Sequence, residues 1–307
     1  MNIISALVTI FGLGLFEIIN SVDNAIINAE VLSTMKAASR KWFVTWGLFF
    51  SVIVVRGLLP FLIVLLLNPK VGILGTITAV FHSDARVAQS LHESAPYLLL
   101  AGGVFMIFVF FHWLFLEEKN FGLPGEKFIA SQGVWFYAIV SILLTVIVWY
   151  AIQVNPYLAL SAVVGSTVFF ITHGFKQQAA QAERSLLKKG MSDISKILYL
   201  EVIDMTFSID GVLGSFAFTF FVPLILIGNG LGAFVLRKIT VSNIENIKKY
   251  LYIKNGAMYS ILILGSIMML DSFRMEIPFW ASPLSTSVIV GYFFLKSTKV
   301  LKLPVSQ

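Results

Sequence analysis

Residues 97–116 read YLLLAGGVFMIFVFFHWLFL, a continuous run without Lys, Arg, Asp or Glu. A helix of about 20 apolar residues is long enough to cross the hydrocarbon core of a bilayer. A barrel strand would alternate apolar and polar residues, which this run does not do. Similar runs recur along the chain and predict an all-α membrane protein with about nine transmembrane helices. The predicted spans are 3–32, 42–67, 97–116, 133–151, 157–173, 197–220, 221–240, 256–271 and 280–296.

The composition excludes the soluble classes. Of the 307 residues, 58% are apolar and 12% are charged, whereas an average soluble domain has about 25% charged residues. The chain contains no cysteine, which removes disulfides and thiolate metal sites. We therefore expect one polytopic membrane domain over 1–307, with the lipid bilayer as its surroundings.

The basic residues predict the topology. Cytoplasmic loops are enriched in Lys and Arg, and with the N-terminus outside, 18 of the 22 basic residues fall in inside segments. The net charge of +6 therefore reflects topology and does not indicate nucleic-acid binding. This plan places the C-terminus in the cytoplasm and suits a bacterial inner membrane, while the oligomeric state stays open.

Acidic residues inside two of these spans require an explanation, because a charge at the bilayer centre costs roughly 2.5–3.5 kcal/mol on insertion scales. Residues 14–25 read GLFEIINSVDNA, and residues 200–211 read LEVIDMTFSIDG. At an offset of 187 residues the two segments share an acid, a serine four residues later and an aspartate two residues after that. The matched residues are Glu17 with Asp204, Ser21 with Ser208, Asp23 with Asp210 and Asn24 with Gly211.

We interpret the two segments as an internal repeat. The copies lie in the first and the sixth predicted spans, so they run in opposite directions through the membrane. The repeat halves are approximately 1–116 and 190–296, joined by 117–189. Inverted repeats of this kind are found in secondary transporters, whose sites lie near the bilayer midplane between the halves.

The repeated residues offer carboxylate, amide and hydroxyl oxygens, which suit Mg²⁺, Ca²⁺ or Mn²⁺. The acids outnumber the charge of one dication, so some should be protonated when the site is empty, and exchange of the cation for protons follows. On a regular second helix Asp210 lies about 120° from Asp204; either both flanks of that helix are used, or the helix loosens near Gly211 and Gly214. The predicted metal ligands are Glu17, Asn20, Ser21, Asp23, Asn24, Asp204, Ser208 and Asp210.

Other polar residues receive accessory roles. Arg56 lies within a predicted span and Arg237 at the end of another, and both are candidate counter-charges or snorkelling residues. Glu201 shares a face with Asp204, and Glu30 follows Asp23 by seven residues as a relay or an interfacial acid. We expect His112 and His173, near span ends, to be interfacial.

The two acidic segments resemble the signatures of the TerC family of membrane proteins, within the LysE-like transporter superfamily. Residues 16–25 are similar to its first signature, residues 204–210 to its second, and Arg237 follows a Gly/Ala-rich stretch as in that family. The resemblance implies a divalent-cation exporter, with manganese the usual cargo. Gly211 stands where many members carry a small polar residue, as in a divergent TerC-like branch.

Three functions remain open at this point. The leading one is a secondary transporter that exports a divalent cation, most readily Mn²⁺, in exchange for protons, without enzymatic activity or a permanently bound cofactor. A membrane scaffold or assembly factor would use the polar residues only as contacts between helices. An intramembrane aspartyl protease would use Asp23 and Asp210 as its dyad, but the expected Gly-x-Gly-Asp context is absent.

Overall fold

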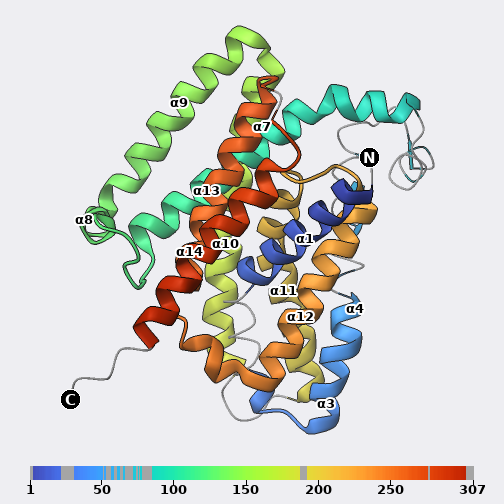
Figure 1. Ribbon diagram of the computed structural model, residues 1–307, viewed down its shortest axis with the longest axis vertical. Helices are drawn as coiled ribbons and strands as arrows, with labels where there is room; N and C mark the ends of the chain where they lie inside the picture. The colour runs from blue at the N-terminus through green and yellow to red at the C-terminus, as the bar shows by residue number, and fades with distance from the viewer. Residues whose placement is uncertain are drawn as a thin grey trace.

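A computed structural model describes residues 3–21, 31–50, 85–186, 192–275 and 277–301, together with scattered positions between 52 and 77. Within these ranges some helical residues have no described side chain, among them 202–207, 237 and 239–248. The described part of the chain is helical and contains no strand (Figure 1). The sequence prediction of an all-α protein is confirmed at this level.

The helices follow the predicted spans, with different ends. Helix α7 begins before its predicted span, and α10 and α12 continue beyond theirs. The first predicted span, 3–32, contains a helix that ends at Asn20, and the predicted span 42–67 is described only in part. The long helices are α1 (Ile3–Asn20), α7 (Ala85–Leu116), α9 (Phe136–Val154), α10 (Pro156–Leu186), α11 (Asp193–Ser215), α12 (Val222–Lys248), α13 (Ile253–Ser272) and α14 (Ala281–Leu301). The short ones are α3 (Ala37–Trp42), the π-helix η1 (Phe43–Gly47), α4 (Leu48–Phe50), α8 (Glu126–Ser131) and the 3₁₀-helix η4 (Gly133–Trp135).

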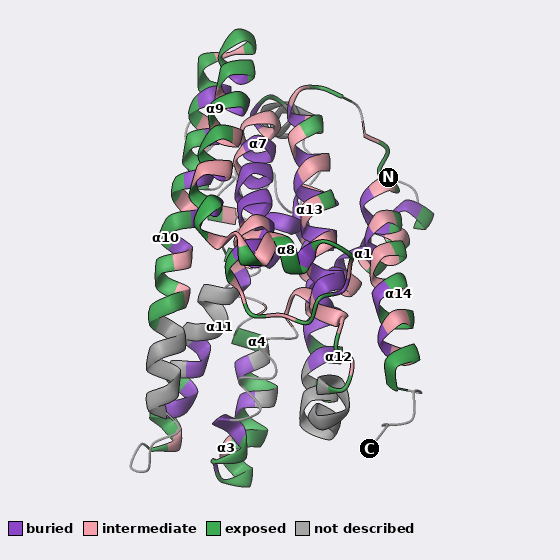
Figure 2. Ribbon diagram, turned by 90° about the vertical axis from the view of Figure 1, so that its left-hand side faces the viewer, coloured by how far each residue is buried: buried purple, intermediate pink, exposed green. Residues whose placement is uncertain are grey.

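Helix α7 lies at the centre of the bundle and packs against α13 and α10. Figure 2 shows its buried residues in purple, while the outer helices α9 and α10 are largely exposed. The α7–α13 contact is close because Gly103 has no side chain: a Cβ there would lie 2.8 Å from the carbonyl oxygen of Gly265. Small residues allow such backbone approach between membrane helices.

The exposed surface of the outer helices is apolar. On α9 the side chains of Ile142, Trp149 and Val154 are more than 60% exposed, which in water would be an unusually large apolar patch. Within the described residues, five helical segments are long and apolar enough to cross a bilayer, and Val222–Leu236 is a shorter apolar helix. The five segments are Ile3–Asn20, Glu93–Leu116, Gly133–Val154, Pro156–Gln178 and Ile253–Ser272.

Segments predicted to lie on the same side of the membrane contact one another. The Asp193 carboxylate at the start of α11 accepts hydrogen bonds from the Lys36 backbone N–H (3.1 Å) and the Ser39 hydroxyl (2.7 Å). The Lys196 amine donates to the Thr34 hydroxyl at 2.8 Å. These bonds join the segments 33–41 and 174–196, which were both predicted to lie between spans on the same side of the membrane.

Glu126 anchors the segment between α7 and α9. Its buried carboxylate accepts hydrogen bonds from the Gly122 N–H at 2.6 Å, the Asn255 amide at 3.2 Å and the Tyr259 hydroxyl at 2.8 Å. We expect Glu126→Gln to lower the free energy of unfolding by about 1–3 kcal/mol, because the amide nitrogen cannot accept and one buried donor loses its partner. Thermal unfolding in detergent measures this change.

Glu118→Gln is the control, because it changes an exposed acid nearby and should leave stability unchanged. Equal melting temperatures of the wild type and both variants would contradict the anchoring role of Glu126.

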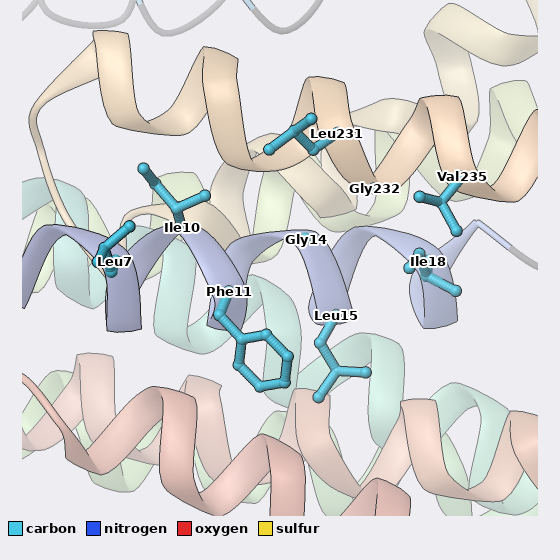
Figure 3. A pocket seen from close by; sticks show the side chains of 9 residues that line it. All are labelled: Leu7, Ile10, Phe11, Gly14, Leu15, Ile18, Leu231, Gly232 and Val235. Carbon is cyan, nitrogen blue, oxygen red and sulfur yellow. The ribbon is translucent and has the colours of Figure 1, made fainter.

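Helices α1 and α12 lie against each other along a seam of glycines. A Cβ on Gly232 would lie 2.5 Å from the Gly14 carbonyl oxygen and 2.8 Å from the Glu17 Cβ. A groove of about 330 Å³ is lined by residues of both helices, and these are apolar residues together with Gly14 and Gly232. Figure 3 shows the residues that line it. The lining contains no ligand for a cation, so the seam serves to bring the two helices together.

This seam gives a steric prediction. We expect Gly232→Ala to destabilise the protein by about 1–3 kcal/mol, because the added methyl group overlaps backbone that cannot move without separating α1 from α12. Gly174→Ala is the matched control, since a Cβ on Gly174 in α10 meets nothing within 4 Å and Ala favours helix over Gly. Melting temperatures in detergent compare the two variants; an undiminished melting temperature for Gly232→Ala would rule out the tight seam.

Candidate functional site

Glu17 of α1 is 1% exposed although it lies on an apolar helix. The Ser21 hydroxyl, one turn later, donates a hydrogen bond to Glu17 Oε1 at 2.8 Å. The acid and the serine of the repeated pattern are therefore in direct contact in the first copy. Asp23, Asn24 and Glu30 lie outside the described residues.

Glu17 and Asn20 face the second acidic segment, on α11. A Cβ added to Gly211 would lie 3.2 Å from Glu17 Oε2 and 3.4 Å from the Asn20 side-chain nitrogen. The absence of a side chain at Gly211 thus lets α11 approach these polar groups. The structure brings together the two segments that sequence comparison matched, and any side chain at position 211 would contact the Glu17 carboxylate.

Helix α11 is continuous through Gly211 and Gly214 and ends at Ser215. Of the two sequence alternatives, the regular helix is the one observed. The Gly211 carbonyl accepts a hydrogen bond from the Ser215 hydroxyl at 2.6 Å, and that hydroxyl accepts one from the Asn229 amide of α12 at 2.8 Å. This carbonyl is therefore engaged within the protein.

Asp210 forms an ion pair with Lys176 of α10 through its Oδ2 atom. Its other oxygen, Oδ1, is buried and has no hydrogen-bond partner among the described residues. One carboxylate oxygen is thus neutralised by the ammonium group, and the other can accept a bond from a ligand.

The predicted span 157–173 ends three residues before Lys176, which leaves this lysine in the predicted gap between spans. In the structure α10 continues to Leu186, so the lysine remains beside the bundle. Residues 174–186 include Gln, Ala, Glu, Arg and Leu and contain no proline, and these residue types favour helix. This composition could have predicted that the helix continues past residue 173. It could not have predicted the partner of Lys176.

The remaining predicted residues are placed as follows. Ser208 and Glu201 are buried on α11, and Asp204 lies on the same helix without a described side chain. Arg237 lies on α12, likewise without a described side chain, and Arg56 is outside the described residues. The predicted roles of Asp204 as a ligand and of Arg56 and Arg237 as counter-charges therefore stay predictions.

Within the described residues no group of three or more His, Cys, Asp or Glu side chains is close enough together to hold a metal ion. The oxygen donors that are described near the α1–α11 contact are the carboxylate of Glu17, the hydroxyl of Ser21 and the amide of Asn20. Such hard donors suit Mn²⁺, Mg²⁺ or Ca²⁺. Asp210 and Ser208, both buried on α11, are further candidate ligands. The other predicted ligands, Asp23, Asn24 and the Asp204 side chain, lie outside the description.

Long apolar helices with exposed apolar surfaces, around a centre that buries carboxylates, define a helical integral membrane protein. Comparison with protein families identifies the particular family: residues 22–302 match the model described as "Protein of unknown function (DUF475)". The chain therefore belongs to the DUF475 family. No curated protein and no solved structure matches it.

Proposed function

We propose that this protein is a secondary transporter that exports a divalent metal cation, with Mn²⁺ as its cargo, in exchange for protons. The observation that carries the proposal is the burial of Glu17 against Gly211, the residue that follows Asp210 on α11. Two acidic segments from distant parts of the chain thus meet inside an apolar bundle. Buried carboxylates are costly, and a transported cation is a reason for keeping them.

Charge supports the same function. Glu17 and Asp210 carry two potential negative charges, and Lys176 offsets one of them. The oxygen donors at the contact match those that bind Mn²⁺. A bound dication would neutralise the carboxylates that protons neutralise in its absence, so that cations and protons compete for the same groups.

The resemblance to the TerC family adds to this proposal, since that family's members are identified as divalent-cation exporters. We further propose that residues 1–116 and 190–296 form an inverted repeat and that the chain crosses the membrane nine times with its N-terminus outside. The proposed membrane is a bacterial inner membrane. The cation site then lies between the two repeat halves, near the bilayer midplane.

A scaffold function explains the buried polar groups less well. The same bundle contains a neutral contact between helices, in which Asn229 donates to Ser215. Amides and hydroxyls of this kind are sufficient to join membrane helices. Glu17 and Asp210 are ionisable groups that helix association does not require.

Transport in proteoliposomes tests the proposal. Vesicles with purified protein and a trapped metal-sensitive dye are given Mn²⁺, Mg²⁺, Ca²⁺ or Zn²⁺ outside, with and without a pH gradient. We expect entry of Mn²⁺ above the rate of protein-free vesicles, accelerated by an acidic interior and accompanied by proton movement in the opposite direction. No divalent flux with any ion would overturn the transporter and favour the scaffold.

A further inference from the structure

A pair of histidines lies outside the carboxylate site. His112 of α7 and His173 of α10 have ring centroids 3.9 Å apart, with their planes at 51°. Aromatic rings surround them: Phe136 of α9 meets His112 edge-on, and Phe169 stacks on His173. The sequence predicts two interfacial histidines near span ends, and the fold places them against each other.

The charged groups around the pair come from three helices and from the residue that follows α7. Beyond the end of α7, Glu117 Oε1 lies 3.2 Å from His112 Nδ1, and Glu117 Oε2 lies 2.9 Å from the amine of Lys254 on α13. On the other side, Lys176 follows His173 by three residues on α10 and pairs with Asp210 of α11. Helix α9 faces the pair with the ring of Phe136.

Glu117 remains a carboxylate over the range in which histidines titrate. Burial by itself raises its pKa, but the hydrogen bond to His112 and the positive charge of Lys254 bring the pKa down to about 2. A lowered pKa in the folded state means that the stabilisation is present above the ordinary value and is lost only as the pH falls towards about 2. Glu117 is therefore a fixed negative charge beside the pair at neutral pH.

Two imidazolium rings this close repel each other strongly in a partly buried environment. The Glu117 carboxylate favours a first proton on the pair, whereas the second must bind beside an existing positive charge. Such a pair takes up its two protons in separate steps that belong to both residues together.

We propose that the His112–His173 pair is a proton-binding site of this protein. We further propose, resting on the proposed transport function, that a proton bound there and a divalent cation at the carboxylate site disfavour each other. The pair lies one helical turn from Lys176, so its positive charge adds to that of the ammonium group beside Asp210. By linkage, the cation must then release protons from the pair.

Titration of the two rings tests the proton site. The chain has four histidines, so His82→Gln/His92→Gln leaves only the pair, and nitrogen-15 NMR of this variant in nanodiscs follows both imidazoles. We expect two separated titration steps, and a single step for His173 when His112→Gln is added. One simple titration step for each ring, or a His173 titration unchanged by His112→Gln, would overturn the proton site. This measurement does not depend on transport activity.

Proton release on cation binding tests the antagonism. Mn²⁺ is added to detergent-solubilised, weakly buffered protein at pH 6.5, and released protons are counted with an indicator dye. We expect His173→Gln to lower the release at least twofold relative to wild type and to His82→Gln. Equal release from all three would refute the antagonism, even if Mn²⁺ is transported. Two-step titration in a protein that moves no cation would instead uphold the proton site and refute the transport function.

Discussion

Glu17→Gln and Asp210→Asn are each expected to lower the rate of Mn²⁺ transport in proteoliposomes at least tenfold. Each substitution keeps the size of the side chain and removes one potential negative charge: that of Glu17 at the contact between α1 and α11, or that of Asp210, which pairs with Lys176. A site with hard oxygen ligands binds a dication largely through such charges, and a tenfold loss corresponds to only about 1.4 kcal/mol of binding free energy.

Glu118→Gln is the matched control, because it makes the same chemical change at an exposed acid. Circular dichroism and size-exclusion profiles should show that all variants fold and insert alike. Transport by Glu17→Gln and Asp210→Asn at the wild-type rate would remove both residues from the site. A loss confined to Asp210→Asn would restrict the site to α11 and its neighbours.

Lys176→Met is expected to destabilise the protein by about 3–5 kcal/mol, since it leaves the largely buried Asp210 without its cationic partner. The side chains of Lys176 and Asp210 are 19% and 11% exposed, so water can replace the ammonium group only in part. Methionine keeps much of the length and apolar stem of lysine, which isolates the effect of charge.

The double variant Lys176→Met/Asp210→Asn provides the test of this mechanism. We expect it to recover most of the lost stability, because removing both members of a buried pair eliminates the uncompensated charge. Unfolding is measured in mixed detergent micelles for the wild type, the two single variants and the double variant, which together form a double-mutant cycle. Additive effects of the two substitutions would show that the ion pair does not contribute to stability.

The sequence predicted the helical architecture well where apolar runs are long. The segment 97–116 was identified from its lack of charge, and it forms the C-terminal part of α7. Helix ends were predicted less well: α10 continues past residue 173 because helix-forming polar residues follow the apolar run. Hydropathy detects where lipid ends, and a helix can extend beyond that point.

The candidate site was predicted in part. Matching residues 14–25 with 200–211 singled out Glu17 and Gly211, which the structure places side by side. Lys176 was missed because its partner is on another helix, and the histidine pair was missed for the same reason. Pairing between helices depends on which faces meet, which a pattern within one helix does not specify.

The sequence alone determined that this chain belongs in a membrane and which side chains are costly there, because both follow from the free energy of transferring single residues into lipid. The tertiary structure decided which of those side chains meet. It did so through steric fit at glycines: Gly232 admits α12 to the backbone of α1, and Gly211 brings α11 to Glu17. Helix rotation and separation at these contacts set the distances between charges, and those distances determine what the site can bind.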